Sequence, residues 1–131
     1  MILAEKISRR DAISLVNDVA LGLAALDVVG GEILRELGLS ELPYYLISFY
    51  VWGRELSDEP PKPIPRELVE RAKEVLKEKL EERLAQLEEK KEELRGIGYS
   101  DRDLRILESH YRSSYEVAVA ALDRLSQDLV G

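Results

Sequence analysis

The chain has 131 residues, of which 45% are apolar and 34% charged, and its formal net charge is −7. This length and balance predict one domain with a modest hydrophobic core and exclude a disordered chain. The lack of cysteine excludes disulfides, thiolate metal sites and cysteine nucleophiles, and it fits a reducing compartment. The negative charge argues against a broad nucleic-acid surface, because a phosphate backbone repels such a protein.

Other sequence features bear on location and source. The N-terminal MILAEKISRR lacks the basic segment, apolar run and cleavage site of a signal peptide. The longest apolar region, VALGLAALDVVGG, is interrupted by Asp27 and is too short to span a bilayer. We therefore expect a cytoplasmic protein without a membrane partner. The chain has no threonine, one asparagine and two glutamines, and scarce amides beside abundant Glu, Arg and Lys are typical of thermophiles.

The first predicted helix covers residues 9–37. Ser8 and Asp11 resemble a capping box at its start, and Gly38 is placed to cap its end. Gly30-Gly31 is expected to kink or split this helix, since each glycine costs about 1 kcal/mol in a helix interior. Apolar residues recur at the helical spacing of three and four. They are Ile13, Val16, Ala20, Leu23, Leu26, Ile33 and Leu37, and the stripe is widened by Leu15, Val19, Leu21, Val28 and Val29.

The second predicted helix covers residues 42–56 and is rich in aromatic side chains. Ser40 is expected to cap it, and Pro43 suits its first turn. LPYYLISFYVW shows no strict alternation of apolar and polar residues, so a helix is favoured over a half-buried strand. Core packing is the favoured interpretation of the aromatics, and the alternative is a partner surface, since Tyr and Trp are frequent interface anchors. The aromatic residues are Tyr44, Tyr45, Phe49, Tyr50 and Trp52.

Residues 57–65, SDEPPKPIP, separate the second helix from the third. Four prolines in six positions exclude a helix and predict a stiff, extended connector, with an SH3-type ligand as the less favoured interpretation. The third predicted helix covers residues 65–95, and 19 of the 30 residues from Arg66 to Arg95 are charged. Thirty helical residues reach about 45 Å, so we expect the far end to project or to pack on another chain. The plainer alternative is a solvated charged face.

The last predicted helix covers residues 101–129. Gly96 and Gly98 end the third helix, and Ser100 with Asp103 resembles a second capping box. Apart from Glu108, apolar residues then recur every seven positions, which is the spacing of a coiled coil. The two phases of this seam are Leu104, Tyr111, Ala118 and Leu125, and Glu108, Tyr115, Leu122 and Leu129.

The chain has one histidine, His110, and we compared its surroundings in the sequence with the motifs of several kinds of catalytic and metal site. A Glu-x-x-His di-iron motif is absent, because Leu107 lies three residues before it. One histidine with carboxylates makes a weak zinc site, and no nucleophile elbow or phosphate-binding loop is present. EILRELGLSELPYYLISF has the outline of a helix-turn-helix, but its second helix carries no basic residue. We therefore predict no metal site and no cofactor.

The stretch RILESHY nevertheless carries a resemblance. Arg105 and His110, separated by four residues near the start of the last helix, resemble the motif of HEPN domains. The resemblance implies a metal-independent ribonuclease site across a homodimer, often in toxin–antitoxin or defence systems. His110 would then handle the proton of the 2′-hydroxyl or the leaving group, and Arg105 would hold the phosphate. The family commonly has a polar residue after the arginine and a tyrosine two after the histidine, where this chain has Ile106 and Arg112.

The alternative is that Arg105 and His110 have only a structural role. Arg105 and His110 are about 140° apart around one helix at 100° per residue, so they do not converge within one straight helix. His110 flanks the heptad seam, where a structural histidine is ordinary. More loosely, PIPRELVERAKEVL is similar to helical subunits of the archaeal GINS replication complex.

These observations predict an all-α protein, a single-domain four-helix bundle with one long, highly charged helix. The leading functional hypothesis is a non-enzymatic helical interaction protein, either a homo-oligomer or a small subunit of a larger complex. Its partner would be a protein, a second copy or an unknown one. The alternative is a HEPN-like ribonuclease that uses Arg105 and His110 and binds RNA. The predicted interaction residues are Tyr44, Tyr45, Phe49, Tyr50, Trp52, Tyr111 and Tyr115.

Overall fold

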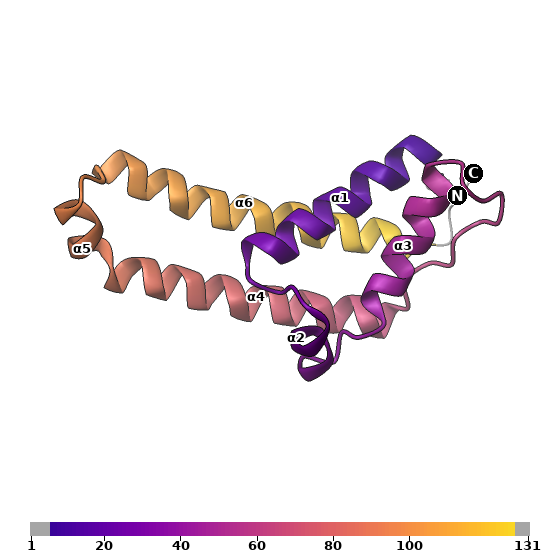
Figure 1. Ribbon diagram of the computed structural model, residues 1–131, viewed down its shortest axis with the longest axis horizontal. Coiled ribbons are helices and arrows are strands. Elements are labelled where there is room, and N and C mark those ends of the chain that lie inside the picture. Colours follow the sequence, from indigo (N-terminus) through magenta and orange to yellow (C-terminus); the bar gives the residue numbers. More distant parts are fainter. Residues whose placement is uncertain (1–5, 128–131) are drawn as a thin grey trace, which may run out of the picture.

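A computed structural model of the chain describes residues 6–127, which form six helices and no β-strand (Figure 1). The all-helical prediction is confirmed for these residues, but the predicted arrangement of four helices is not. The helices are α1 (Arg9–Ala25), α2 (Gly31–Glu36), α3 (Leu42–Gly53), α4 (Arg66–Glu89), α5 (Lys91–Gly96) and α6 (Asp101–Leu125).

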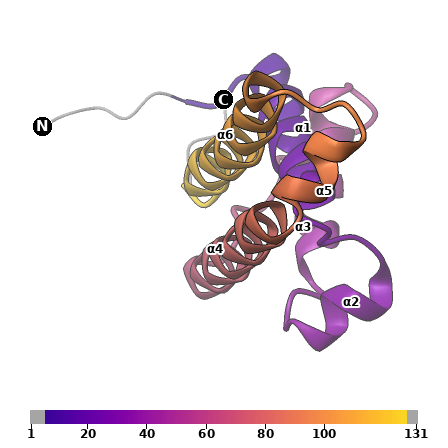
Figure 2. The same ribbon diagram turned by 90° about the vertical axis from the view of Figure 1, so that its left-hand side faces the viewer.

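A long hairpin of α4 and α6 forms the frame of the molecule. The two helices run antiparallel, and the short α5 lies at the turn between them (Figure 1). Helix α1 packs along one half of α6, and α3 packs against α1. Figure 2, which looks along the hairpin, shows α2 set off to one side near α3. The half of the hairpin next to α5 therefore extends beyond the other helices.

The predicted helix over 9–37 is split into α1 and α2, as the glycine pair led us to expect, but α1 already ends at Ala25, before that pair. Asp27 adopts a left-handed conformation with φ of 60°, and the N–H of Val28 donates to the carbonyl of Leu23 at 2.7 Å. This is the Schellman arrangement that closes a helix, here formed without glycine. Gly30, with φ of 97°, then reverses the chain into α2.

The other boundaries also differ from the predictions in places. Helix α3 begins after Glu41 without the predicted cap from Ser40, although Pro43 lies in its first turn as expected. The predicted third helix is broken at Lys90, which separates α4 from α5. At the start of α6, the predicted capping box of Ser100 and Asp103 is confirmed in both directions. Residues 128 and 129 of the predicted last helix, including Leu129 of the seam, lie outside the described residues.

Two glycines set the depth at which α1 is packed. A Cβ atom on Gly22 would lie 2.4 Å from Cβ of Ala118 on α6, and one on Gly53 of α3 would lie 2.7 Å from Cγ1 of Ile13. Both helix crossings therefore need a residue without a side chain at the contact. The result is one continuous core that draws on five of the helices and on the connector. Its largest fully buried side chains include Phe49, Leu26, Leu42, Ile64, Leu76 and Leu122.

The proline-rich connector is anchored at both of its ends. The guanidinium of Arg9 donates to the carbonyls of Trp52 and Ser57, which holds the exit from α3. Near the other end, Ile64 is buried and its N–H donates to the carbonyl of Leu125 at 2.9 Å. The connector thus joins the end of α6 to the α1–α3 pair and is part of the folded unit.

Candidate interaction surfaces

The aromatic cluster of α3 divides between the core and the surface. Phe49 and Trp52 are buried, and Tyr45 is half-buried and packs against the core. Tyr44 and Tyr50, by contrast, are exposed. Core packing, the favoured interpretation, therefore holds for Phe49 and Trp52, whereas Tyr44 and Tyr50 are placed where a partner could reach them.

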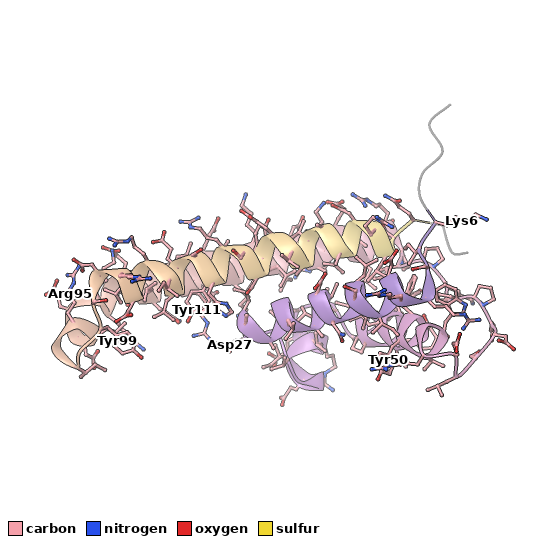
Figure 3. The ribbon with its side chains drawn as sticks, turned by 90° about the horizontal axis from the view of Figure 1, so that it is seen from above. Lys6, Asp27, Tyr50, Arg95, Tyr99 and Tyr111 are labelled. Carbon is pink, nitrogen blue, oxygen red and sulfur yellow. The ribbon has the colours of Figure 1, made fainter. Side chains whose placement is uncertain are left out.

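The exposed side of α3 is unusually apolar. Tyr44 is 66% exposed and Ile47, one turn further along, is 60% exposed. With Tyr50 and Val51 these residues form what we call the α3 outer face. Between this face and Pro60–Lys62 of the connector lies a shallow groove of about 270 Å³. The α3 outer face therefore offers two phenol groups, an aliphatic surface and an adjoining groove. Figure 3 labels Tyr50 on α3.

The heptad seam of α6 packs against other helices of the same chain. Leu104, Ala118 and Leu125 are buried, and Tyr111 and Tyr115 are half-buried against the core. The seam faces α4 and α1, which are the two long helices that α6 contacts. Tyr111 and Tyr115 thus belong to internal packing over much of their surface, and the seam does not form a free coiled-coil face.

Arg105 and His110 are not brought together in one chain. Both side chains are exposed on α6, but they line separate hollows. Arg105 lies with Arg95 and Asp101 at the hairpin end, in a recess of about 150 Å³. His110 instead lies in a groove between α6 and α1. A site that uses both residues would need a second chain.

The groove between α1 and α6 was not predicted from the sequence. It is open, measures about 540 Å³ and runs where α1 crosses the middle of α6. Leu21 of α1, which was expected to widen the core stripe, is 68% exposed, and Val117 of α6 is 46% exposed. We call the lining of this groove the α1–α6 face. The lining residues are Asp18, Leu21, Gly22, Ala24, Ala25, His110, Ser113, Ser114 and Val117.

One signal in the sequence could have indicated the α1–α6 face. Among its nine residues only Asp18 and His110 are titratable, in a chain that is 34% charged. Three exposed neighbours on the same helices, Asn17, Ala20 and Ala120, are also uncharged, and Glu116 is a charged one beside Val117. Depletion of charged residues marks the centre of protein–protein interfaces more reliably than apolar content does.

The hairpin end has a different electrostatic character, because several of its charged side chains are paired with one another. A hydrogen bond to Asp101 at 2.9 Å, together with the charge of that carboxylate, raises the pKa of Arg95. The backbone N–H of Ser100 donates to Asp103 at 2.9 Å and lowers the pKa of the Asp103 carboxyl group. Over residues 6–127, no group of three or more His, Asp or Glu side chains is placed to hold a metal ion.

Comparison with models of known protein families, with curated proteins and with solved structures gave no significant match. The resemblances to HEPN domains and to GINS subunits therefore rest on their quoted residues alone. No helix among the described residues is long and apolar enough to cross a lipid bilayer.

Proposed function

We propose that this chain is a non-enzymatic helical interaction protein that works in the cytoplasm, either as a homo-oligomer or as a small subunit of a larger complex. The observation that carries the proposal is the α3 outer face, where Tyr44 and Ile47 remain largely exposed. A helix that is apolar on all sides is ordinarily covered on all sides. Exposed Tyr beside aliphatic side chains is also the composition of interface anchors.

The shape of the chain supports the same proposal. In such an assembly α1, α3, α4 and α6 act as one four-helix unit, from which the highly charged end of the α4–α6 hairpin projects (Figure 1). Many charges at this end are neutralised within one turn, for example by Lys91–Glu88 at 2.6 Å and Arg95–Glu92 at 2.6 Å. Exposed pairs of this kind contribute little stability, so they mainly keep the projecting surface soluble.

The test uses the α3 outer face directly. Tagged wild-type protein and an Ile47→Glu variant are used to capture partners from the source cells, and the solution mass of each complex is measured by light scattering. Gln86→Glu, which adds the same charge on exposed α4, is the matched control. We expect wild type and Gln86→Glu to form the same complex and Ile47→Glu to lose it. Equal recovery by all three chains would refute a role of the α3 outer face.

A second candidate is the HEPN-like ribonuclease that uses Arg105 and His110. It is favoured by one observation, which is that both side chains are exposed on α6 and can be reached by a second chain. Cleavage of a single-stranded RNA by wild type and its loss in a folded His110→Ala variant would support this candidate. Equal cleavage by both proteins would remove it.

A further inference from the structure

The α1–α6 face has chemistry that suits a second copy of this chain. Two copies that each carry a net charge of −7 repel one another. They can approach closely only where neither presents an excess of acid. The α1–α6 face meets that condition, because Asp18 is its one acidic residue and His110 its one imidazole. Exposed Leu21 and Val117 supply apolar surface between them.

Asp18 and His110 lie at opposite ends of this groove. Gly22 of α1 lies against Ser114 and Ala118 of α6, and the two helices run antiparallel. Asp18 is one turn before Gly22, toward the end of α6, whereas His110 is one turn before Ser114, toward its start. At 1.5 Å per residue the two side chains are about 15 Å apart along the helices. The face therefore has an acceptor at one end and a donor at the other.

We infer that the α1–α6 face pairs with the same face of a second copy around a two-fold axis. The axis crosses the groove midway between Asp18 and His110, in the plane of the face and perpendicular to the line that joins them. Rotation by 180° then brings each His110 to the partner's Asp18, so the contact is made twice, as in any isologous interface. The imidazole N–H donates to the carboxylate, and Leu21 and Val117 are buried between the two pairs.

This inference rests on the proposed function, since it names the partner as a second copy and the surface as the α1–α6 face. It differs in the surface used, because the α3 outer face lies on another helix. The self-association therefore can fail while a partner still binds α3, and the two results are measured separately.

The test exchanges the charges at the two ends of the groove. Asp18→Lys and His110→Glu are prepared as single variants, and self-association is followed by sedimentation velocity over a range of protein concentrations. In Asp18→Lys the new ammonium group would face the partner's imidazole, and in His110→Glu the new carboxylate would face the partner's Asp18. Each single variant should therefore dimerise at least about tenfold more weakly than wild type.

Mixing the two variants should restore dimers. In the mixed dimer one contact is the native pair of His110 and Asp18, and the other joins the introduced ammonium group to the introduced carboxylate. Every cationic or imidazole group at the ends of the groove then meets a carboxylate, so the mixture should associate about as strongly as wild type.

Glu32→Lys on α2 and Gln86→Glu on α4 introduce the same side chains at exposed positions away from the face, and they should dimerise as wild type does. Circular dichroism confirms that each variant keeps its helices, which is expected since Asp18 is only half-buried and His110 is exposed. The inference is overturned if wild type stays monomeric at every concentration. It is equally overturned if the single variants associate like the controls, or if the mixture fails to form heterodimers.

Discussion

Arg83 of α4 is ion-paired with Asp27, the left-handed residue that ends α1. The same guanidinium lies over the ring of Tyr111 on α6, 5.8 Å from its centroid. One side chain thus ties together the end of α1 and both helices of the hairpin, and Figure 3 shows Asp27 beside Tyr111 at this junction. Asp27 therefore has two opposing effects on stability: its left-handed backbone is unfavourable, and its ion pair with Arg83 is favourable.

Glu55→Gly and Asp27→Gly should therefore differ in their effect on stability. Both residues have φ near 60°, a conformation that costs a residue with a side chain about 1 kcal/mol or more and costs glycine little. Glu55→Gly is expected to raise the free energy of unfolding by about 1 kcal/mol. Asp27→Gly should gain less, because it also breaks the pair with Arg83. Urea unfolding of both variants measures the difference, and a larger gain for Asp27→Gly would contradict the role of Arg83.

Gly22→Ala should be strongly destabilising, whereas Gly31→Ala should not. At Gly22 the added methyl group would lie 2.4 Å from Cβ of Ala118 and 2.9 Å from the carbonyl oxygen of Ser114, a backbone atom that cannot turn away. Overpacking of this kind costs about 1–3 kcal/mol. At Gly31 no atom lies within 4 Å, so Gly31→Ala should be neutral or slightly stabilising. Thermal unfolding of both variants measures this difference in stability. Equal melting temperatures would show that α1 and α6 are not closely packed.

Much of the helical layout could be predicted from local chemistry. Some helix boundaries depend on only a few neighbouring residues and can be recognised directly in the sequence. They are the capping box of Ser100 and Asp103 and the helix-ending or helix-starting glycines Gly30, Gly38 and Gly98. The end of α1 could not be predicted in the same way, because Asp27 is held in a conformation that favours glycine by a partner 56 residues away. The break at Lys90 falls within EEKKEELR, where every residue favours a helix.

The surfaces were harder to predict than the helices. Helix α1 is apolar on several sides, and the sequence does not say which side meets α6, which meets α3 and which stays open. The sequence therefore predicted that Leu21 is part of the core, whereas in the structure it lines an open groove. The 140° between Arg105 and His110 correctly indicated that the two would not converge in one chain, because that angle depends only on helix geometry.

The capping of α6 should weaken in acid. The Ser100 N–H lowers the pKa of Asp103 below its ordinary value of 3.8, so the ionised carboxylate is stabilised in the folded state. This contribution is fully present above pH 3.8 and is lost as the pH falls through the lowered pKa. We expect wild type to exceed Asp103→Asn in unfolding free energy at about pH 6 and the difference to shrink in strong acid. A difference that persists unchanged at every pH would mean that the carboxylate charge plays no part.

The aromatic residues of α3 should separate into two classes when each is replaced by alanine. Phe49→Ala removes a fully buried ring and is expected to cost about 3–5 kcal/mol of stability. Tyr44→Ala removes an exposed ring that touches Tyr45 edge-on, and its cost should stay within about 0.5 kcal/mol. Partner binding should respond in the opposite sense, with Tyr44→Ala weakening capture while the fold is intact. Chemical unfolding and capture measured on the same two variants test this division. A Tyr44→Ala protein that unfolds as easily as Phe49→Ala would place Tyr44 in the core and remove the α3 outer face from consideration.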